Sequence, residues 1–558
     1  MRRREFIARS AAASTAVLAG CGTKSAKKYD LLIVKGLVFD GRGNPGVEAA
    51  VAVNGDKVVA ISTELKPDEA RTVIDARGMA VSPGFIDPHT HTDIQLLVNP
   101  PAESKIRQGV TTEIGGNCGG SYYPIGDANF EEIRDNLKKE FDLDLTWRDI
   151  EGFFSVLEQG GSAVNYATLV GNGSLRSAVV GPYDRRATPD EMAAMKRIIG
   201  DYMDAGAVGM SSGLEYTPSS FADARELAEL CAVIQARGGV HASHIRSESD
   251  TLLESLDEII GVARQSGVRT EIAHFKAAYE ANWHKIDDAL MRLQDADREF
   301  GNILADRYTY DAYSTGLGYV YPIWAKEGTT EDFLNRLRDK TLDAQLRAAV
   351  GTFEKKLGTW DRMQISEVTT DTNRKYEGMT ILAAAGDAGK APYDFIRDIL
   401  IEEKANVGIV GFAMSEENLM KVLAHPLVMV GSDGNSAAPY GPLGTGKPHP
   451  RYYGTFPRML GRYVRERNVV PLETAIMKMT SMPAAHFGFN GRGILETGAF
   501  ADITVFDPAT VIDRATFQNP HQYPEGIPYV VVNGTVVISE GEHTGELPGR
   551  ILRHTSRA

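Results

Sequence analysis

The side chains best suited to chemistry in this sequence are histidines, a cysteine and an aspartate that follow short apolar runs. His89 and His91 stand two positions apart, directly after the run 84–86. Side chains at positions i and i+2 of an extended segment point to the same side, so both imidazoles can reach one metal ion. Taken alone, this spacing is explained equally well by two surface histidines in a turn.

Four further residues of metal-binding type stand at the ends of apolar runs. They are Cys118, His244, His274 and Asp433. Taken singly, the cysteine could be a buried inert thiol and the aspartate an ordinary turn residue. Imidazole, thiolate and carboxylate together, however, are ligands that suit zinc. If the runs are strands of one barrel, their ends converge at its mouth, and the sequence predicts a zinc centre there.

Apolar runs alternate with helical patterns through the middle of the chain, which is typical of an α/β barrel. Nine runs compete for eight strand positions: 84–91, 111–117, 165–171, 207–213, 239–246, 269–276, 303–310, 407–413 and 427–433. We assign 303–310 to the seventh strand and 428–433 to the eighth, which leaves 407–413 outside the barrel. The predicted fold class is a (β/α)8, TIM-like barrel.

Both ends of the chain show short strand patterns with turn signals. Residues 29–82 contain the hairpin signal Asn54-Gly55, and residues 488–558 contain apolar strands between 501 and 538. We therefore expect one small β-sandwich domain built from both ends, with the barrel of residues 83–487 between them. Residues 313–384 interrupt the barrel pattern, and so long an insertion usually forms a lid over the mouth.

The first 21 residues have the features of an export signal. Arg3 and Arg4 belong to a twin-arginine pattern, and the apolar stretch that follows ends in a lipobox, with Cys21 as the lipidated residue. We expect an exported protein that is anchored by this lipid on the outer side of the cytoplasmic membrane or in the periplasm. The net charge of −14 argues against nucleic acid or an anionic membrane surface as a partner.

Six motifs of this chain resemble those of the amidohydrolase superfamily and, within it, the N-acyl-D-amino-acid deacylases (D-aminoacylases). They are Gly84–His91, Gly116–Gly119, Ser212–Tyr216, Ala273–Lys276, Gly431–Gly434 and His449–Arg458. The resemblance implies a zinc-dependent enzyme that hydrolyses the amide bond of N-acyl-D-amino acids and releases a free D-amino acid.

The resemblance also implies roles for the metal-binding residues. Cys118, His244 and His274 would bind one zinc ion tightly. His89 and His91 would bind a second, weaker divalent metal together with Cys118. Asp433, which also belongs to the metal-binding set, would be the catalytic acid–base.

The same resemblance implies that the substrate is a small molecule with a free carboxylate. Lys276, Tyr308, Ser314 and Arg451 match the positions that bind this carboxylate, and Tyr216 is a further substrate-binding residue. Arginine can bind a carboxylate through two parallel hydrogen bonds, and lysine adds a point charge. The chain departs from the family pattern in the loop 433–451, which is longer than usual, and at Thr309, where a proline is common.

Three other functions are compatible with parts of this pattern. A dipeptidase that releases a C-terminal D-amino acid would use the same chemistry. A cyclic-amide hydrolase, similar to dihydroorotases and hydantoinases, would usually carry a carboxylated lysine on its fourth strand, and the run 207–212 has none. A lipoprotein that only binds metal or solute would not need an acid–base such as Asp433 at the mouth.

Overall fold

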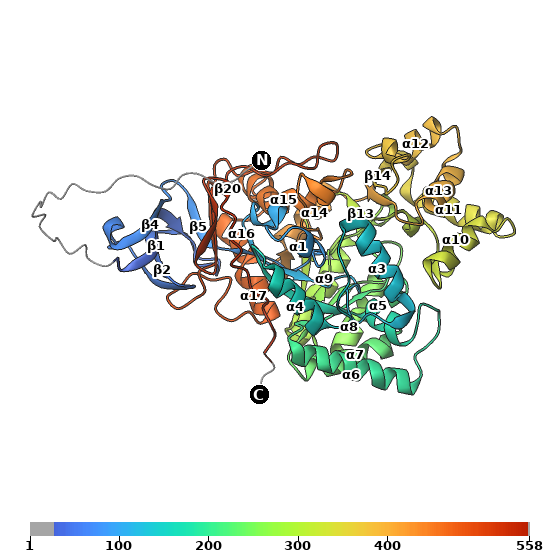
Figure 1. The fold of residues 1–558 in the computed structure, drawn as a ribbon, viewed down its shortest axis with the longest axis horizontal. Coiled ribbons are helices and arrows are strands. Elements are labelled where there is room, and N and C mark those ends of the chain that lie inside the picture. Colours follow the sequence, from blue (N-terminus) through green and yellow to red (C-terminus); the bar gives the residue numbers. More distant parts are fainter. Residues whose placement is uncertain (1–26, 556–558) are drawn as a thin grey trace, which may run out of the picture.

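The computed structural model describes residues 27–555 (Figure 1). The predicted export signal and Cys21 lie outside these residues. Within the described part of the chain, no helix combines the length and the apolar character needed to cross a membrane.

Eight parallel strands form the central barrel, as the sequence predicts. Their order around the sheet is β16-β12-β11-β10-β9-β8-β7-β6. The strands are β6 (Phe85–Asp87), β7 (Val110–Gly115), β8 (Asn165–Gly171), β9 (Gly209–Gly213), β10 (Val240–His244), β11 (Arg269–Ile272), β12 (Ile303–Arg307) and β16 (Val428–Val430). The seventh and eighth strands are those assigned from the sequence, and the run 407–413 lies outside the barrel.

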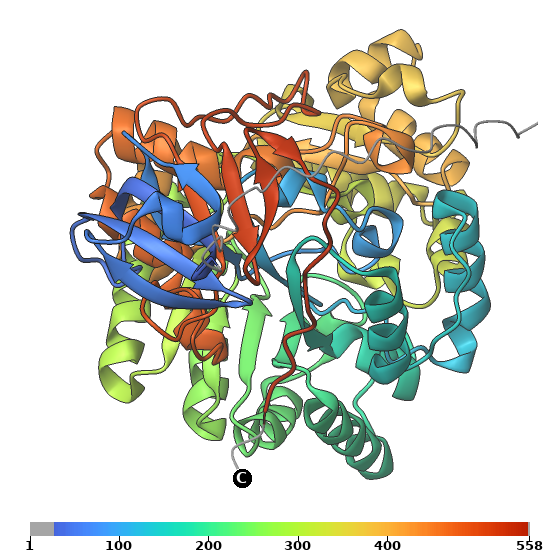
Figure 2. The same ribbon diagram turned by 60° about the vertical axis from the view of Figure 1, so that its left-hand side comes forward.

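Helices pack around the outside of the barrel (Figure 2). They include α3 (Asp127–Phe141), α4 (Ile150–Gly160), α5 (Asn172–Val179), α6 (Pro189–Ala205), α7 (Ala224–Gln235), α8 (Leu252–Ser266), α9 (Ile286–Phe300), α14 (Glu416–Ala424) and α16 (Leu472–Met479). The longer helices bury residues on one face only, and their polar faces remain in solvent.

Helix α6 shows how the local sequence sets these elements. Thr188 and Glu191 form a capping box at its start, Pro189 occupies its first turn, and Gly206 ends it with φ 119°. Its buried large side chains recur at helical spacing: Met195, Ile199, Tyr202 and Met203. The sequence therefore fixes where this helix begins, where it ends and which face packs on the barrel.

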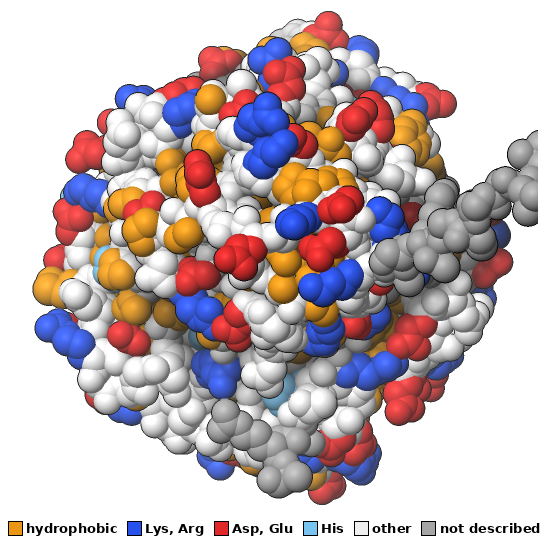
Figure 3. Space-filling view, turned by 90° about the vertical axis from the view of Figure 1, so that its left-hand side faces the viewer, with side chains coloured by type: hydrophobic (Ala, Val, Ile, Leu, Met, Phe, Trp, Pro, Cys, Tyr) orange, Lys and Arg blue, Asp and Glu red, His pale blue; other side chains and the backbone are white. Residues whose placement is uncertain are grey.

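Both chain ends contribute to a second sheet, which is the expected small β domain. Its nine strands include β1 (Tyr29–Val38), β2 (Val47–Asn54), β3 (Lys57–Ser62), β4 (Ala70–Asp75), β5 (Ala80–Pro83), β17 (Ile503–Phe506), β18 (Tyr529–Val532), β19 (Thr535–Ser539) and β20 (Glu542–His543). The two ends meet where β17 runs antiparallel to β5, directly before the first barrel strand. The face of the molecule that carries this sheet shows acidic and basic side chains intermixed (Figure 3).

An inserted unit after β12 has a sheet and a hydrophobic core of its own. The sheet has the order β13-β15-β14 and consists of β13 (Tyr313–Gly316), β14 (Met363–Glu367) and β15 (Gly408–Gly411). Its helices are α10 (Thr330–Arg338), α11 (Asp343–Leu357), α12 (Ile381–Asp387) and α13 (Pro392–Glu402). The run 407–413 is apolar because β15 is the central strand of this small sheet.

The barrel closes between β6 and β16 through residues that follow both strands. The Asp433 backbone N–H donates to the His89 carbonyl at 2.8 Å. Lys105, in α2 (Glu103–Ile106), is fully buried, and its Nζ donates to Asp87 Oδ2 at 2.9 Å, Ser432 Oγ at 2.6 Å and the Gly434 carbonyl at 3.1 Å. The buried Lys105 ammonium group therefore connects the end of β6 with the residues that follow β16.

We predict that Lys105→Met lowers the free energy of unfolding by about 3–5 kcal/mol, because it leaves the buried Asp87 carboxylate without its cation. Denaturant unfolding followed by circular dichroism measures the change. Lys35→Met is the matched control, since it removes only the exposed ion pair with Asp75, and it should cost less than about 1 kcal/mol. Equal losses in the two variants would contradict this role for Lys105.

Candidate active site

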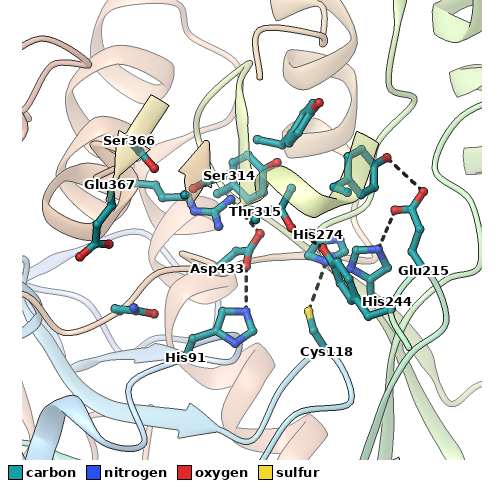
Figure 4. Close-up of a pocket in the computed structure, with 18 of the residues that line it drawn as sticks. His91, Cys118, Glu215, His244, His274, Ser314, Thr315, Ser366, Glu367 and Asp433 are labelled. Carbon is teal, nitrogen blue, oxygen red and sulfur yellow. Dashed lines mark hydrogen bonds and ion pairs between the residues drawn. The ribbon is translucent and has the colours of Figure 1, made fainter. Parts of the chain in front are cut away.

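The carboxyl ends of the barrel strands open into a pocket with a volume of ≈ 410 Å³ (Figure 4). All the site residues predicted from the sequence line it except His89, which is fully buried beside it. The lining residues from that set are His91, Cys118, Tyr216, His244, His274, Lys276, Tyr308, Ser314, Asp433 and Arg451. The structure therefore brings the candidate metal ligands and the residues predicted to bind a carboxylate to one place.

The candidate metal ligands form two donor groups that share the Cys118 thiol. The first is Cys118, His244 and His274, and the second is His89, His91, Cys118 and Asp433. Cys118 Sγ lies 3.5 Å from His274 Nε2 and 3.3 Å from His89 Nε2. A tetrahedral zinc ion with bonds of about 2.3 Å to sulfur and about 2.0 Å to nitrogen places these atoms about 3.5 Å apart. The donor set therefore fits zinc.

The charges in the pocket keep the key donors ionised. Burial opposes ionisation of Cys118, but the neighbouring His89 and His274 outweigh it and hold the pKa of the thiol well below its usual range. Burial likewise opposes the charge of Asp433, and Arg451 and His91 hold the pKa of this carboxyl well below its usual range. Thiolate and carboxylate are the forms that bind a metal ion.

Three of the candidate ligands have backbone conformations that non-glycine residues rarely adopt. Cys118, His274 and Asp433 have φ values of 51°, 38° and 50°. Left-handed backbone at a non-glycine residue costs energy and concentrates at functional sites. The tight bends redirect each chain just past a barrel strand, which turns the side chain toward the pocket. No pattern in the sequence indicates these bends.

Buried carboxylates orient the imidazoles from behind. Asp306 Oδ2 lies 3.1 Å from His89 Nδ1 and also accepts the His274 backbone N–H at 3.0 Å. Glu248 Oε1 lies 2.7 Å from His274 Nδ1. A carboxylate on the second ring nitrogen fixes the tautomer and orientation of a metal-binding histidine. Sequence reasoning missed Asp306 and Glu248, although the position of Asp306 on the face of a barrel strand offered a signal.

Glu215 plays a similar part at His244. Its Oε2 lies 3.1 Å from His244 Nε2, and Tyr319 of the inserted unit donates to its Oε1 at 3.1 Å. Glu215 precedes Tyr216, whose ring lies against His244 with the centroids 4.8 Å apart. The motif Ser212–Tyr216 thus supplies two contacts to one imidazole, of which the sequence analysis named only Tyr216.

The residues predicted to bind a carboxylate include two cations that already contact acidic side chains. Lys276 Nζ is paired with Glu248, and Arg451 Nη1 lies 2.8 Å from Asp433 Oδ2. The Tyr308 hydroxyl and Arg451 Nε are buried, and neither has a hydrogen-bond partner among the described residues. A buried donor without a partner is costly, and both residues line the pocket, so these two atoms are candidate contacts for a ligand.

The chain matches a family model described as "Amidohydrolase family" over residues 72–538. This match covers most of the sequence and includes every residue of the candidate site. The chain belongs to the amidohydrolase family. The resemblance seen in the sequence motifs is thereby confirmed.

Several relatives of known activity are similar over nearly their whole length. The D-aminoacylase of Alcaligenes xylosoxydans xylosoxydans is 35% identical over 95% of this chain and 98% of its own. A crystal structure of N-acyl-D-glutamate deacylase from Bordetella bronchiseptica, with zinc and a phosphonate inhibitor, is 33% identical with a TM-score of 0.80, over 94% of this chain and 100% of that one. A D-aminoacylase structure described by its binuclear metal centre is 34% identical with a TM-score of 0.78, over the same shares.

We predict that Cys118→Ala loses tightly bound zinc, because the thiolate is common to both donor groups. Elemental analysis of the purified protein measures the bound metal. Cys231→Ala is the control, since that thiol is buried in α7 away from the pocket, and its zinc content should match the wild type. An undiminished zinc content in the Cys118 variant would show that Cys118 is not a ligand of the tightly bound zinc ion.

Proposed function

We propose that this amidohydrolase is a zinc-dependent deacylase of N-acyl-D-amino acids, which releases a carboxylate and a free D-amino acid. The observation that carries the proposal is the meeting, in one pocket, of a zinc-fitting donor group with two unpartnered donors, Tyr308 Oη and Arg451 Nε. The donor group suits amide hydrolysis, and the free donors suit a substrate carboxylate. The activities of the similar deacylases support the same conclusion.

A bound zinc ion supplies Lewis acidity, which activates water and polarises an amide carbonyl. A carboxylate oxygen of Asp433 takes a proton from the attacking water and gives it to the amide nitrogen as the C–N bond breaks. Arg451 holds this carboxylate in place through its 2.8 Å ion pair. Asp306 and Glu248 keep His89 and His274 in the orientation that the donor groups require.

The carboxylate of the substrate would be bound by Arg451, Tyr308 and Lys276, with Ser314 on the adjoining wall. Fixing the carboxylate at one end and the amide carbonyl at the other leaves one direction for the side chain on the α-carbon. This two-point attachment gives selection for one enantiomer. It also lets binding energy orient the reacting bond.

We infer one tight ion in the group Cys118, His244 and His274, and a weaker one in the group that contains Asp433. The two groups share one thiolate, and the other anionic donor of the second group, Asp433, is already paired with Arg451. An ion there would also occupy the carboxylate that must move protons. The working enzyme of this proposal therefore holds a single zinc ion.

The proposal is tested by incubating zinc-loaded protein with N-acetyl-D-methionine and N-acetyl-L-methionine and measuring the amine released. We expect turnover of the D enantiomer at least about tenfold above the L enantiomer, equivalent to roughly 1.4 kcal/mol. A cyclic substrate such as dihydrouracil serves as the comparison for a cyclic-amide hydrolase. Turnover of the cyclic amide alone would overturn the proposal.

We predict that Asp433→Asn abolishes turnover while the tight zinc ion remains bound. Asparagine keeps the shape of the side chain but cannot accept a proton at neutral pH. Steady-state kinetics and metal analysis on the same preparation provide the two measurements. A kcat close to that of the wild type would show that another group moves the proton.

We predict that Arg451→Met lowers kcat/KM by at least about tenfold, or roughly 1.4 kcal/mol. The loss should shrink for a substrate whose α-carboxylate is replaced by an amide. This comparison removes the contribution of the Arg451–Asp433 contact, which acts equally on both substrates. Equal losses on the two substrates would mean that Arg451 does not bind the carboxylate.

We also propose that the protein is exported and lipid-anchored through Cys21, on the basis of the twin-arginine pattern and the lipobox. We predict that Cys21→Ala shifts the protein from the membrane fraction to the soluble fraction of the producing cells. Fractionation followed by immunoblotting measures the distribution. A variant that remains with the membranes as the wild type does would contradict lipid anchoring.

A further inference from the structure

One charged side chain of the pocket differs from the others in having no partner. The other acidic side chains of the lining each contact a basic group: Glu215 contacts His244, Glu248 contacts Lys276, and Asp433 contacts Arg451. Glu367, the last residue of β14, lines the same pocket. Its carboxylate forms no ion pair or side-chain hydrogen bond with any residue that the structure describes.

The surroundings of Glu367 are acidic as well. Glu367 is exposed to the solvent of the pocket. The protein packed around it, followed by the charges of Glu140 in α3 and Glu377, raises the pKa of its carboxyl to about 7. Burial raises the pKa of the Glu377 carboxyl, and two cations, Arg374 and Lys447, act against this rise. The charges that act on Glu367 are those of the carboxylates Glu140 and Glu377, which create a negative potential that attracts positive charge.

The small sheet of the inserted unit places Glu367 two strands away from the strand that carries Ser314, and both residues line the same pocket. Ser314 lies in β13, and Gly316 of that strand is paired with Gly408 of β15, which is paired in turn with Glu367. Two strand spacings of about 4.8 Å separate Gly316 from Glu367, so the distance across is about 10 Å. Figure 4 shows Glu367 and Ser366 at one end of the pocket and Glu215 and His244 at the other, with Asp433 between them.

We propose that Glu367 binds a cationic group of the substrate, so that the enzyme prefers substrates that carry an ammonium or guanidinium group. The inference rests on the proposed deacylase function and names its substrate class. The cation can come from a basic D side chain, as in an N-acyl-D-lysine or N-acyl-D-arginine. It can also come from the free amino group of a dipeptide that ends in a D-amino acid. Substrates with an acidic D side chain would be repelled by the same carboxylate.

Two matched pairs of substrates separate these sources. N-acetyl-D-lysine is compared with N-acetyl-D-norleucine, which has a similar shape without the charge. Glycyl-D-alanine is compared with N-acetylglycyl-D-alanine, in which the amino group is blocked. The ratio of kcat/KM within each pair is measured for the wild type, for Glu367→Gln and for Glu354→Gln. Glu354 lies in α11 of the same inserted unit and does not line the pocket.

We expect the charged member of one pair to be preferred by the wild type, and Glu367→Gln to lower that ratio at least about tenfold. The pair affected identifies the source of the cation. Glu354→Gln should leave both ratios unchanged. The preference should be larger at pH 8 than at pH 6 in the wild type, because a carboxyl group with a pKa of about 7 is protonated below that pH and ionised above it. Glu367→Gln should show no such difference.

The outcomes distinguish this inference from the proposed function. If the wild type hydrolyses N-acetyl-D-norleucine and neither ratio falls in Glu367→Gln, the role of Glu367 is overturned while the deacylase function stands. If the wild type hydrolyses neither N-acetyl-D-methionine nor any of the four compounds, the deacylase function is overturned. Calorimetric binding of D-lysine and D-norleucine then decides on Glu367, since a weaker preference for D-lysine in Glu367→Gln supports cation binding and an unchanged preference overturns it.

Discussion

The site depends on the neutralisation of buried charge by close partners. The Cys118 thiolate is stable in a half-buried position because imidazoles surround it, and both donor groups include this thiolate. Asp433 is stabilised by Arg451, and Glu248 by Lys276. Removing a single member of such a pair leaves an uncompensated buried charge. The candidate ligands, the proposed acid–base and the cations proposed to bind a carboxylate are therefore energetically coupled, and replacing one of them affects its neighbours.

The barrel and most of the site could be predicted because their signals are local. Each candidate ligand directly follows an apolar run, and the geometry of a parallel barrel brings strand ends together. The sequence offers nine runs for eight strand positions, and the assignment of 303–310 and 428–433 to the barrel, with 407–413 outside it, agrees with the structure. His89 and His91 carried their own spacing signal. The family motifs added the separate roles expected of Cys118, as a zinc ligand, and of Asp433, as the acid–base. Spacing alone does not give these roles.

Other features depend on contacts between distant residues, and local patterns do not encode them. The positive φ values at Cys118, His274 and Asp433 result from the bends that end three separate strands. The pairing of Arg451 with Asp433 joins residues that the sequence analysis assigned to different tasks. Glu215 and Glu248 escaped notice because a glutamate in a loop is ordinarily a solvated residue. Their importance follows only from the histidines that they contact.

The pocket is assembled from two units with separate hydrophobic cores. The candidate metal ligands stand on the barrel, whereas Ser314 and Glu367 stand on the sheet of the inserted unit. This unit has its own core around Leu346 and Ile396. Tyr308 belongs to this second core and lines the pocket, so it connects the two units. Replacements on the inserted sheet can change which substrates are accepted without disturbing the barrel that performs the chemistry. Such a division lets one hydrolytic centre diversify into enzymes of different selectivity through changes in a single wall.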